Sequence, residues 1–501
     1  MLTPERIKSL IESDYNSTKK QYARIGQRYY EGDHDIKKFK IFFLDKDGNV
    51  HEDLTKSNIK ICRPFFAELV DQGVQHQLSG KDSFIRSDIP ELQHQLDVYF
   101  NNNRKFRAEL YKILIDSEVK GEGYAYAYKN AEGRTCFMCA DSAGVVEVRA
   151  RETDDNCEYV IYWYVDRINQ ENKPIKRIEV WDSQQTTFFK QVENGPITLD
   201  ENEKDNPRPH IVYTKDDKGD KYGKGYGVIP FFCLPNNPKH TSSLKLVKDH
   251  IDDYDLMNCG LSNNIQDAAE VLVVVRGFEG DDLDEFMQNV KAKKHVGTPT
   301  ANDNVEYRTI DIPVEARKVK MEIDKENIFH DGRGVNMEGL KDSGATVTIA
   351  VRAAFFGLDM KCAAKDYNVE EFLDGPVQVV LNEINEEQKT AYKLSDVYYV
   401  FERESITNAY ENAQIALLEA QTRQAEITTL LTVESKLGNE ETVKLICEQY
   451  DLDYEEIKDK LPKPEEEHDP YSAGAARGAL SAIIPDDEPA AGDEGGGDLI
   501  E

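Results

Sequence analysis

The spacing of apolar residues predicts a helical beginning, a strand-rich middle and a second half made of long helices. Apolar side chains recur every three or four positions in residues 4–31, 64–80 and 101–117, which predicts three helices. Between residues 124 and 192, short segments of alternating polarity are separated by turn sequences, which predicts an antiparallel meander. This sequence of elements is typical of the α+β fold class.

The second half contains two long helices around a small insert. Residues 241–268 carry one apolar stripe at alternating steps of three and four, which predicts a long helix. A strand at 270–276, a helix at 281–294 and a strand at 305–312 form a predicted α/β insert. Residues 314–331 then predict the second long helix.

A Gly- and polar-rich loop leads from that helix into a longer one that contains a proline. Gly375 and Pro376 lie inside the helical pattern of residues 348–392. Because proline removes one intrahelical hydrogen bond, the pattern predicts a kink there, or a second helix that begins at Pro376. A strand at 396–402 and a helix at 408–436 follow.

The composition is strongly acidic. The 501 residues have a formal net charge of -32, with 39% hydrophobic and 31% charged residues. Such a chain repels nucleic acid on average, which excludes strong phosphate clamping as its global property. It can still enclose DNA without gripping it. The acidic, Pro- and Gly-rich tail 462–501 predicts disorder, and the polar segment 200–226 predicts a plain loop.

Neither targeting nor membrane signals are expected. The N-terminus lacks the apolar stretch of a signal peptide, and the longest apolar runs are far too short to span a bilayer. The eight cysteines are scattered, which is typical of free thiols in a reducing cytoplasm. We therefore expect a protein of a reducing cytoplasm that has no membrane partner.

Motifs that carry catalysis are weak. Asp116, Glu118 and Lys120 resemble a fragment of a metal-dependent nuclease motif, but Glu118 is predicted to end a helix, whereas that chemistry needs a strand. Cys136 and Cys139 have no second cysteine pair and no histidine nearby, which favours two core cysteines on a strand. The histidines, among them His34, His210 and His240, lack metal-ligand spacing. The sequence also has no Walker A lysine loop. We expect no cofactor, no metal and no enzymatic activity.

Five segments together resemble the elements of a known family, in that family's order. They are residues 30–36, 58–80, 121–126, 227–237 and 343–344, and the helix at 243–264 corresponds to the polar-rich helix that follows the fourth of them in the family. The family is the portal proteins of tailed bacteriophages, of the siphophage type. The resemblance covers about residues 1–460 and includes the insert between two long helices. One departure is Ala345, which comes one place earlier than the family pattern would have it.

The resemblance implies a portal-like, multi-layer α+β subunit with a named role for each segment. These are a mixed α/β wing (1–240), a first stem helix (241–269), a small α/β clip (270–312), a second stem helix (313–332), a tunnel loop (333–347), a kinked tunnel and wing helix (348–392), a helical crown (393–461) and the disordered acidic tail (462–501).

It also implies the function and the partners. A portal is a ring, usually of twelve copies, at one capsid vertex of the virion, through which double-stranded DNA is packaged and ejected without sequence specificity. Implied partners are the terminase large subunit, scaffolding and major capsid proteins, and the head-completion adaptor that forms the head-tail connection. Terminase and the adaptor would dock on the clip.

Candidate site residues follow from these roles. The proposed channel and tunnel-loop residues are Arg333, Asn336, Glu338, Lys341, Asp342 and Ser343. The proposed basic residues of the stem wall are Arg317, Lys318, Lys320 and Lys325. The proposed clip docking residues are Glu279, Asp281, Asp282, Lys293 and Lys294. The alternatives are a solvated charged helix face for the stem residues and a flexible interhelical connection for the loop, whose glycines allow either.

Two other function classes share some of these features. A scaffold or adaptor protein of the virion would have the same helices and acidic charge without forming a closed ring around DNA. A metal-dependent nuclease would require Asp116, Glu118 and Lys120 to converge on one metal ion.

Overall fold

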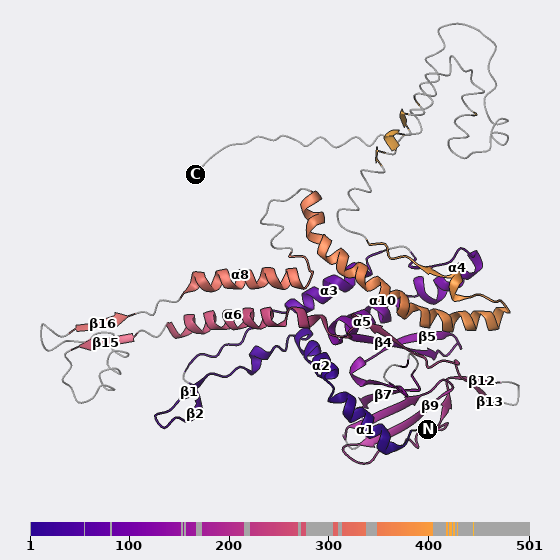
Figure 1. Ribbon diagram of the computed structural model, residues 1–501, viewed down its shortest axis with the longest axis horizontal. Coiled ribbons are helices and arrows are strands. Elements are labelled where there is room, and N and C mark those ends of the chain that lie inside the picture. The colour runs from indigo at the N-terminus through magenta and orange to yellow at the C-terminus, as the bar shows by residue number, and fades with distance from the viewer. Residues whose placement is uncertain are drawn as a thin grey trace, which may run out of the picture. The chain divides into compact units, whose positions relative to one another are not determined.

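The structure, a computed structural model, describes most of the first 403 residues. The described residues are 2–54, 56–80, 83–151, 154, 157–166, 173–214, 221–268, 272–276, 304–308, 313–336, 348–403, 417, 418, 420–422, 424, 425, 428 and 444. The chain divides into two units, Met1–Ala409 and Tyr410–Glu501. Every element named below belongs to the first unit (Figure 1).

The N-terminal helical pattern forms two helices where the sequence predicts one. α1 spans Pro4–Tyr15 and α2 spans Thr18–Tyr30. Ser17 causes the break, because its hydroxyl accepts a hydrogen bond from the backbone N–H of Lys20 and so caps the start of α2. The prediction of one helix over 4–31 was therefore wrong.

A hairpin and a group of helices follow. The hairpin strands are β1 (Phe42–Leu44) and β2 (Val50–Glu52), and a 3₁₀ turn, η1 (Asp35–Lys38), precedes them. The helices are α3 (Phe65–Gln77), α4 (Pro90–Leu96), a π-helical turn η2 (Asp97–Asn101) and α5 (Arg104–Lys120). Asn103 caps α5 by accepting hydrogen bonds from two backbone N–H groups.

The strand-rich middle forms two sheets, so the prediction of one continuous meander over 124–192 was wrong. The first sheet has the order β14-β4-β5, and the second has the order β10-β9-β8-β7-β6 with β11 beside β9. The strands are β4 (Glu122–Lys129), β5 (Thr135–Ala140), β6 (Val145–Val148), β7 (Tyr159–Asp166), β8 (Ile175–Trp181), β9 (Gln185–Val192), β10 (Thr198–Leu199), β11 (Arg208–Pro209) and β14 (Phe231–Pro235).

The change of sheet occurs at a tight turn between β5 and β6. Asp141 caps a 3₁₀ turn, η3 (Ser142–Gly144), and a Cβ on Gly144 would lie 2.1 Å from the carbonyl oxygen of Trp163. Only glycine fits this close approach, which directs β6 away from β5. The segment predicted as a plain loop also contains an antiparallel pair, β12 (Ile211–Thr214) and β13 (Lys221–Lys224).

The second half has the long helices that the pattern predicts, but the first begins at Lys248 and not at residue 241, because a separate 3₁₀ turn precedes it. The elements are a 3₁₀ turn η4 (Ser243–Leu246), α6 (Lys248–Ala268), β15 (Leu272–Arg276), β16 (Asn304–Arg308), α8 (Val314–Asp331), α10 (Thr348–Gln388), a 3₁₀ turn η5 (Leu394–Asp396) and β17 (Tyr398–Tyr399). β15 pairs with β16 in antiparallel fashion, and β17 pairs with β3 (Ile85–Arg86). The predicted helix at 281–294 and the tail lie outside the described residues. Only a few residues of the predicted helix at 408–436 are described.

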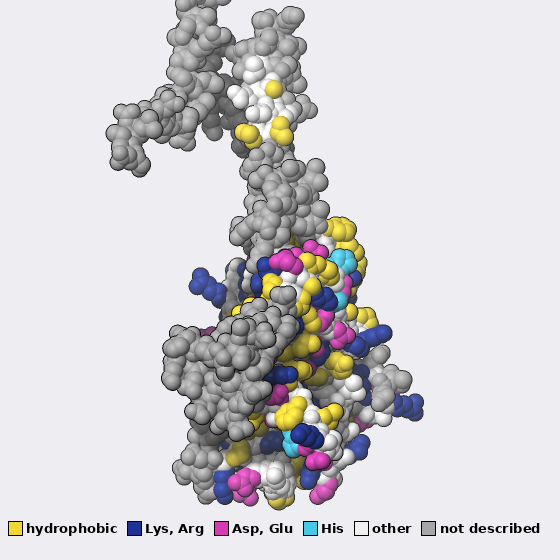
Figure 2. All heavy atoms as spheres, turned by 90° about the vertical axis from the view of Figure 1, so that its left-hand side faces the viewer, with side chains coloured by type: hydrophobic (Ala, Val, Ile, Leu, Met, Phe, Trp, Pro, Cys, Tyr) yellow, Lys and Arg dark blue, Asp and Glu magenta, His cyan; other side chains and the backbone are white. Residues whose placement is uncertain are grey.

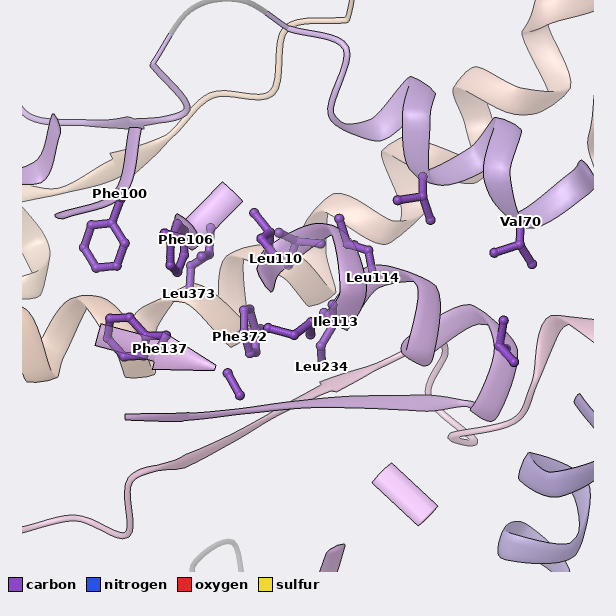
Figure 3. Close-up of a cluster of buried hydrophobic side chains, with 14 of the residues drawn as sticks. Val70, Phe100, Phe106, Leu110, Ile113, Leu114, Phe137, Leu234, Phe372 and Leu373 are labelled. Carbon is purple, nitrogen blue, oxygen red and sulfur yellow. The ribbon is translucent and has the colours of Figure 1, made fainter. Parts of the chain in front are cut away.

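The main hydrophobic core lies around α5. Figure 3 shows Leu110, Ile113 and Leu114 of α5 near Phe372 and Leu373 of α10, with Leu234 of β14 beside them. A second core lies between α1 and the larger sheet, where Ile7 and Ile11 pack against strand residues such as Ile161. Within the described ranges, no helix combines the length and the hydropathy needed to cross a bilayer.

Candidate functional site

α6 and α8 form an antiparallel pair that is held together by charged side chains. At 1.5 Å per residue, the 21 residues of α6 and the 18 of α8 span about 31 and 27 Å. The ammonium of Lys320 bonds the carboxylates of Asp253 on α6 and of Asp324 one turn along α8. The Arg317 guanidinium lies 3.5 Å from the carbonyl oxygen of Met257.

The four basic residues predicted to line a channel therefore divide into two pairs. Arg317 and Lys320 face α6, and a Cβ on Gly260 of α6 would lie 2.3 Å from the Arg317 guanidinium. Lys318 is exposed, at 3.5 Å from Glu315. Lys318 and Lys325 are two helical turns apart and so share one side of α8, away from the α6 contact. Arg317 and Lys320 thus contact α6 of the same chain, whereas Lys318 and Lys325 lie on a different side of α8.

A buried histidine fixes the base of α6. His34 Nδ1 lies 2.6 Å from Asp255 Oδ2 of α6, and both side chains are fully buried. The ring of Tyr29 stacks on the His34 ring at 4.5 Å between centroids, and the backbone N–H of Arg63 donates to the same Asp255 carboxylate. The segment 30–36, which carries part of the family resemblance, thus positions the first long helix.

The loop after α8 is anchored where it begins. Gln72 of α3 donates to the carbonyl oxygen of Val335 at 3.0 Å and accepts from the Val335 backbone N–H at 2.9 Å. Val335 is buried against Leu358 and Cys362 of α10. Arg333 has a positive φ of 52° and lies beside a cavity between α3 and α10. The sequence singled out the loop but gave no signal for Gln72, which is about 260 residues away.

Two glycines of this loop serve packing. A Cβ on Gly332 would lie 2.5 Å from Leu69, and one on Gly334 would lie 2.3 Å from the same side chain. In the structure these glycines let the chain approach α3 closely. The sequence suggested instead that they give the loop conformational freedom. Asn336 lies at the end of this described stretch, and Glu338, Lys341, Asp342 and Ser343 lie outside the described residues. The proposed clip residues, Glu279, Asp281, Asp282, Lys293 and Lys294, also lie outside them.

α10 continues through its proline, so Pro376 does not begin a second helix. In Figure 1 α10 changes direction along its length. A Cβ on Gly375 would lie 2.3 Å from the Phe232 ring of β14, so glycine at this position lets the helix pack closely on the sheet. Gly375 and Pro376 thus have separate effects, one on packing and one on the helical hydrogen bonds.

The cavity beside the loop has a volume of about 500 Å³ and contains a buried charge group. The Lys361 ammonium lies 2.7 Å from Glu118, and Lys365 is 3.8 Å from the same carboxylate. Burial lowers the pKa of Lys365 to about 8, against the opposing effect of Glu118. Lys365 also bonds Ser117 and Asn236, which ties α10 to α5 and to the loop before α6.

The nuclease arrangement is excluded by the directions of its three side chains. Lys120 lies 2.9 Å from Asp116 and 2.8 Å from Asp141, on one side of α5. Glu118 points to the lysines of α10. The three groups therefore do not converge, and lysines occupy the positions where a metal ion would bind the carboxylates.

Glu122, Cys233 and His240 are close enough to hold a metal ion, but a lysine occupies the group. The carboxylate of Glu122 bonds both the Lys19 ammonium and the His240 ring. Burial raises the pKa of Glu122, and these two partners outweigh burial and bring it down to about 2. Burial raises the pKa of the Cys233 thiol well above its usual value, so it stays protonated and is a poor ligand. The group is better described as a salt bridge between α2, β4 and the segment before α6.

Comparisons with known proteins agree on one family. The family model described as "Phage portal protein, SPP1 Gp6-like" matches residues 10–460. The portal protein of Clostridium phage phiCD119 is 22% identical over 436 residues, which cover 82% of this chain and 88% of that protein. The portal protein of Bacillus phage SPP1 is 22% identical over 339 residues, or 67% of this chain and 65% of that protein.

A similar chain is found among solved structures. It comes from a structure described as the neck of an empty GTA particle computed with C6 symmetry. The TM-score is 0.38 at 12% sequence identity, over 70% of this chain and 84% of that chain.

Proposed function

This chain belongs to the phage portal protein family, SPP1 Gp6-like, and we propose that its α6 and α8 helices line the DNA channel of the portal ring. The protein is a structural component of the phage capsid, and the family implies an oligomeric ring that handles DNA together with other phage proteins. What the chain contributes to the channel is inferred from its own helices.

The observation that carries the proposal is the α6–α8 pair. The pair is anchored at its base by the buried His34–Asp255 contact, and it is held together along its length by Arg317 and Lys320. It also ends in a small antiparallel strand pair, β15 and β16. Helices of about 30 Å that are anchored at one end are suited to wall a channel of that depth.

The segments take the roles that the family order suggests. Residues 241–269 and 313–332 form the stem, 270–312 the clip for terminase and the head-completion adaptor, and 333–347 the tunnel loop. The wing is 1–240 and the crown 393–461, and the assembled ring contains about twelve copies. Assembly takes place in the host cytoplasm, where scaffolding and major capsid proteins surround the ring.

Within the stem, Lys318 and Lys325 are the basic residues that we assign to the channel surface. Arg317 and Lys320 are occupied by the α6 contact, whereas Lys318 is exposed on a side of α8 that it shares with Lys325. Sparse lysines on an acidic protein would contact phosphates weakly and leave DNA free to slide.

Electron micrographs of the purified chain test the proposal. We expect rings with a central channel wide enough to pass duplex DNA, with the α6–α8 pairs around it. A protein that stays monomeric at high concentration, both alone and with scaffolding protein, would contradict the channel. Rings in which α6 and α8 lie on the outer surface would also contradict it.

A further inference from the structure

The cavity of about 500 Å³ lies where α3, α10, the end of α8 and the turn before α6 come together (Figure 1). The buried side chains of Phe66, Leu69 and Val70 of α3 form an apolar wall. Leu246 of η4 and Tyr367 of α10 also line the cavity, and they are 67% and 76% exposed. Cavities of this size, with apolar walls and a few polar groups, are typical of sites for small ligands.

Both carboxylates that line the cavity already have partners. Glu118 Oε2 lies 2.7 Å from the Lys361 ammonium, and Glu118 Oε1 lies 3.8 Å from Lys365. Asp331 Oδ1 lies 2.9 Å from Nδ1 of the neighbouring His330. A cationic ligand would therefore have to displace a partner from one of these carboxylates.

Two of the three cationic side chains of the lining keep unused hydrogen-bond donors. Lys365 bonds Ser117 and Asn236 in addition to its carboxylate partner, so its three N–H groups are occupied. The Lys361 ammonium has one carboxylate partner and no second acceptor among the described residues. The Arg333 guanidinium has neither a hydrogen bond nor an ion pair within that part of the chain. These spare donors are suited to an anion.

The two side chains with spare donors start from neighbouring points of the lining. A Cβ on Gly357 of α10 would lie 3.9 Å from the Cα of Arg333. Lys361 follows Gly357 by one helical turn and so shares its side of α10. On the face of the molecule shown in Figure 2, acidic and basic side chains are mixed, so this pair of cations with free donors is a local feature of the cavity.

We propose that the cavity binds a small amphiphilic anion, with its apolar body against α3 and η4 and its charged group between Arg333 and Lys361. A carboxylate, sulfonate or phosphate group on an aromatic or aliphatic body meets both requirements. The charged group accepts charge-assisted hydrogen bonds, and the body covers apolar surface. Three cationic and two acidic side chains line the cavity, which favours a ligand of negative charge.

A ligand at this place would act on the proposed tunnel loop. Arg333 begins that loop directly after α8, whereas Lys361 belongs to α10. An anion that bonds both would join the start of the loop to α10, in addition to the two hydrogen bonds between Gln72 and Val335. This consequence rests on the proposed function, whereas the binding itself depends only on the cavity.

A fluorescent aromatic sulfonate, 8-anilinonaphthalene-1-sulfonate, is a suitable probe, because its emission rises in apolar surroundings. Titration of the full chain should show one site per chain. The dissociation constant should be on the order of 10 µM, as expected for a ligand of about 20 non-hydrogen atoms. N-phenyl-1-naphthylamine has the same rings without the sulfonate, and its binding measures the apolar contribution alone.

Arg333→Asn tests the charged half of the site. The substitution should weaken binding of the sulfonate about tenfold, because a charge-assisted hydrogen bond is lost, and should leave binding of the neutral probe unchanged. Asparagine tolerates the positive φ of 52° at this position. Lys389→Asn is the matched control, since Lys389 is also exposed, has a φ of 56° and does not line the cavity. Arg333→Lys should keep most of the affinity.

Ala364→Trp tests the apolar half. Ala364 is exposed and lines the cavity, so a tryptophan there should fill the space and abolish binding of both probes. Ala363→Trp is the matched control, because Ala363 is exposed on the same helix and does not line the cavity. Circular dichroism verifies the fold of each variant. Hydrogen exchange at residues 333–336 should become slower when the sulfonate is bound.

The outcomes separate this site from the proposed channel. Equally strong binding of the sulfonate to the unsubstituted chain, to Arg333→Asn and to Ala364→Trp overturns the site, and the channel then stands if the chain forms rings. If the variants behave as expected and no rings form, the site stands and the channel fails. Unchanged hydrogen exchange at residues 333–336 with the probe bound would overturn the effect on the loop.

Discussion

Single buried charges in this protein join segments that are far apart in the sequence. Glu122 at the start of β4 bonds Lys19 of α2 and His240 before α6, and its side chain is 4% exposed. Lys365 of α10 does the same for α5 and the loop before α6. Such contacts are specific, because a buried charge that loses its partner is costly.

The substitution Glu122→Gln tests this role. We expect a loss of about 2 kcal/mol of unfolding free energy at neutral pH, less than the full shift in pKa implies because Lys19 is 41% exposed and partly screened. The pKa of Glu122 is lowered to about 2, so its contribution is present above the ordinary value of 4.5 and is lost as pH falls from there towards 2.

Urea unfolding of the two proteins at a series of pH values measures the difference. The difference in unfolding free energy between the two proteins should be constant above about pH 5.5 and should become smaller below pH 4.5. Glu12→Gln on α1 is the control, since Glu12 is 63% exposed and 3.8 Å from Lys8. A gap that does not change with pH would show that Glu122 acts through packing alone.

At the scale of elements, the loop after α8 is set by α3. Two hydrogen bonds from Gln72 hold Val335, and Leu69 of the same helix packs against Gly332 and Gly334. The tunnel loop, as we propose it, therefore starts from a fixed point at Val335.

Gln72→Ala should release this start of the loop. We expect a loss of about 1–2 kcal/mol in local stability, because two hydrogen bonds to buried backbone groups are removed. Hydrogen exchange at residues 333–336 should become faster, and heads should package less DNA while rings still form. Gln75→Ala is the matched control, because Gln75 is exposed on the same helix. Unchanged exchange at Val335 would argue against the anchor.

At the scale of the whole molecule, the net charge determines how strongly the proposed channel would attract DNA. A ring of chains that each have a net charge of -32 offers little electrostatic attraction to duplex DNA. If α6 and α8 line the channel as we propose, the few lysines of α8 would release few counterions when DNA enters. DNA can then move without breaking strong contacts at each step.

Assembled rings should therefore bind DNA weakly and with little dependence on salt. Between 50 and 200 mM salt, a plot of log affinity against log salt should have a slope shallower than about -2, since each neutralised phosphate adds about -0.9. Fluorescence anisotropy with a short duplex measures this slope. A slope near about -6 or steeper would indicate a tight phosphate clamp and contradict the sliding channel.

The sequence by itself determined the elements whose signals are local. α8 begins and ends as its apolar period predicts, and Asn103 caps α5 because a cap acts within three residues. The ordered set of short segments also pointed to the portal family, which the family model over residues 10–460 confirms. Each of these conclusions depends only on residues that are close together in the sequence, or on the order of short segments along it.

Only the tertiary structure decided which way the side chains face and which strands pair. Arg317 and Lys320 lie among other charged residues of α8, and nothing in α8 itself says that they meet α6, about 60 residues earlier. Gly332 and Gly375 are ambiguous in the sequence, because the atoms that require glycine there belong to Leu69 and Phe232. Such choices depend on contacts between residues far apart in the chain, and local spacing contains no record of those contacts.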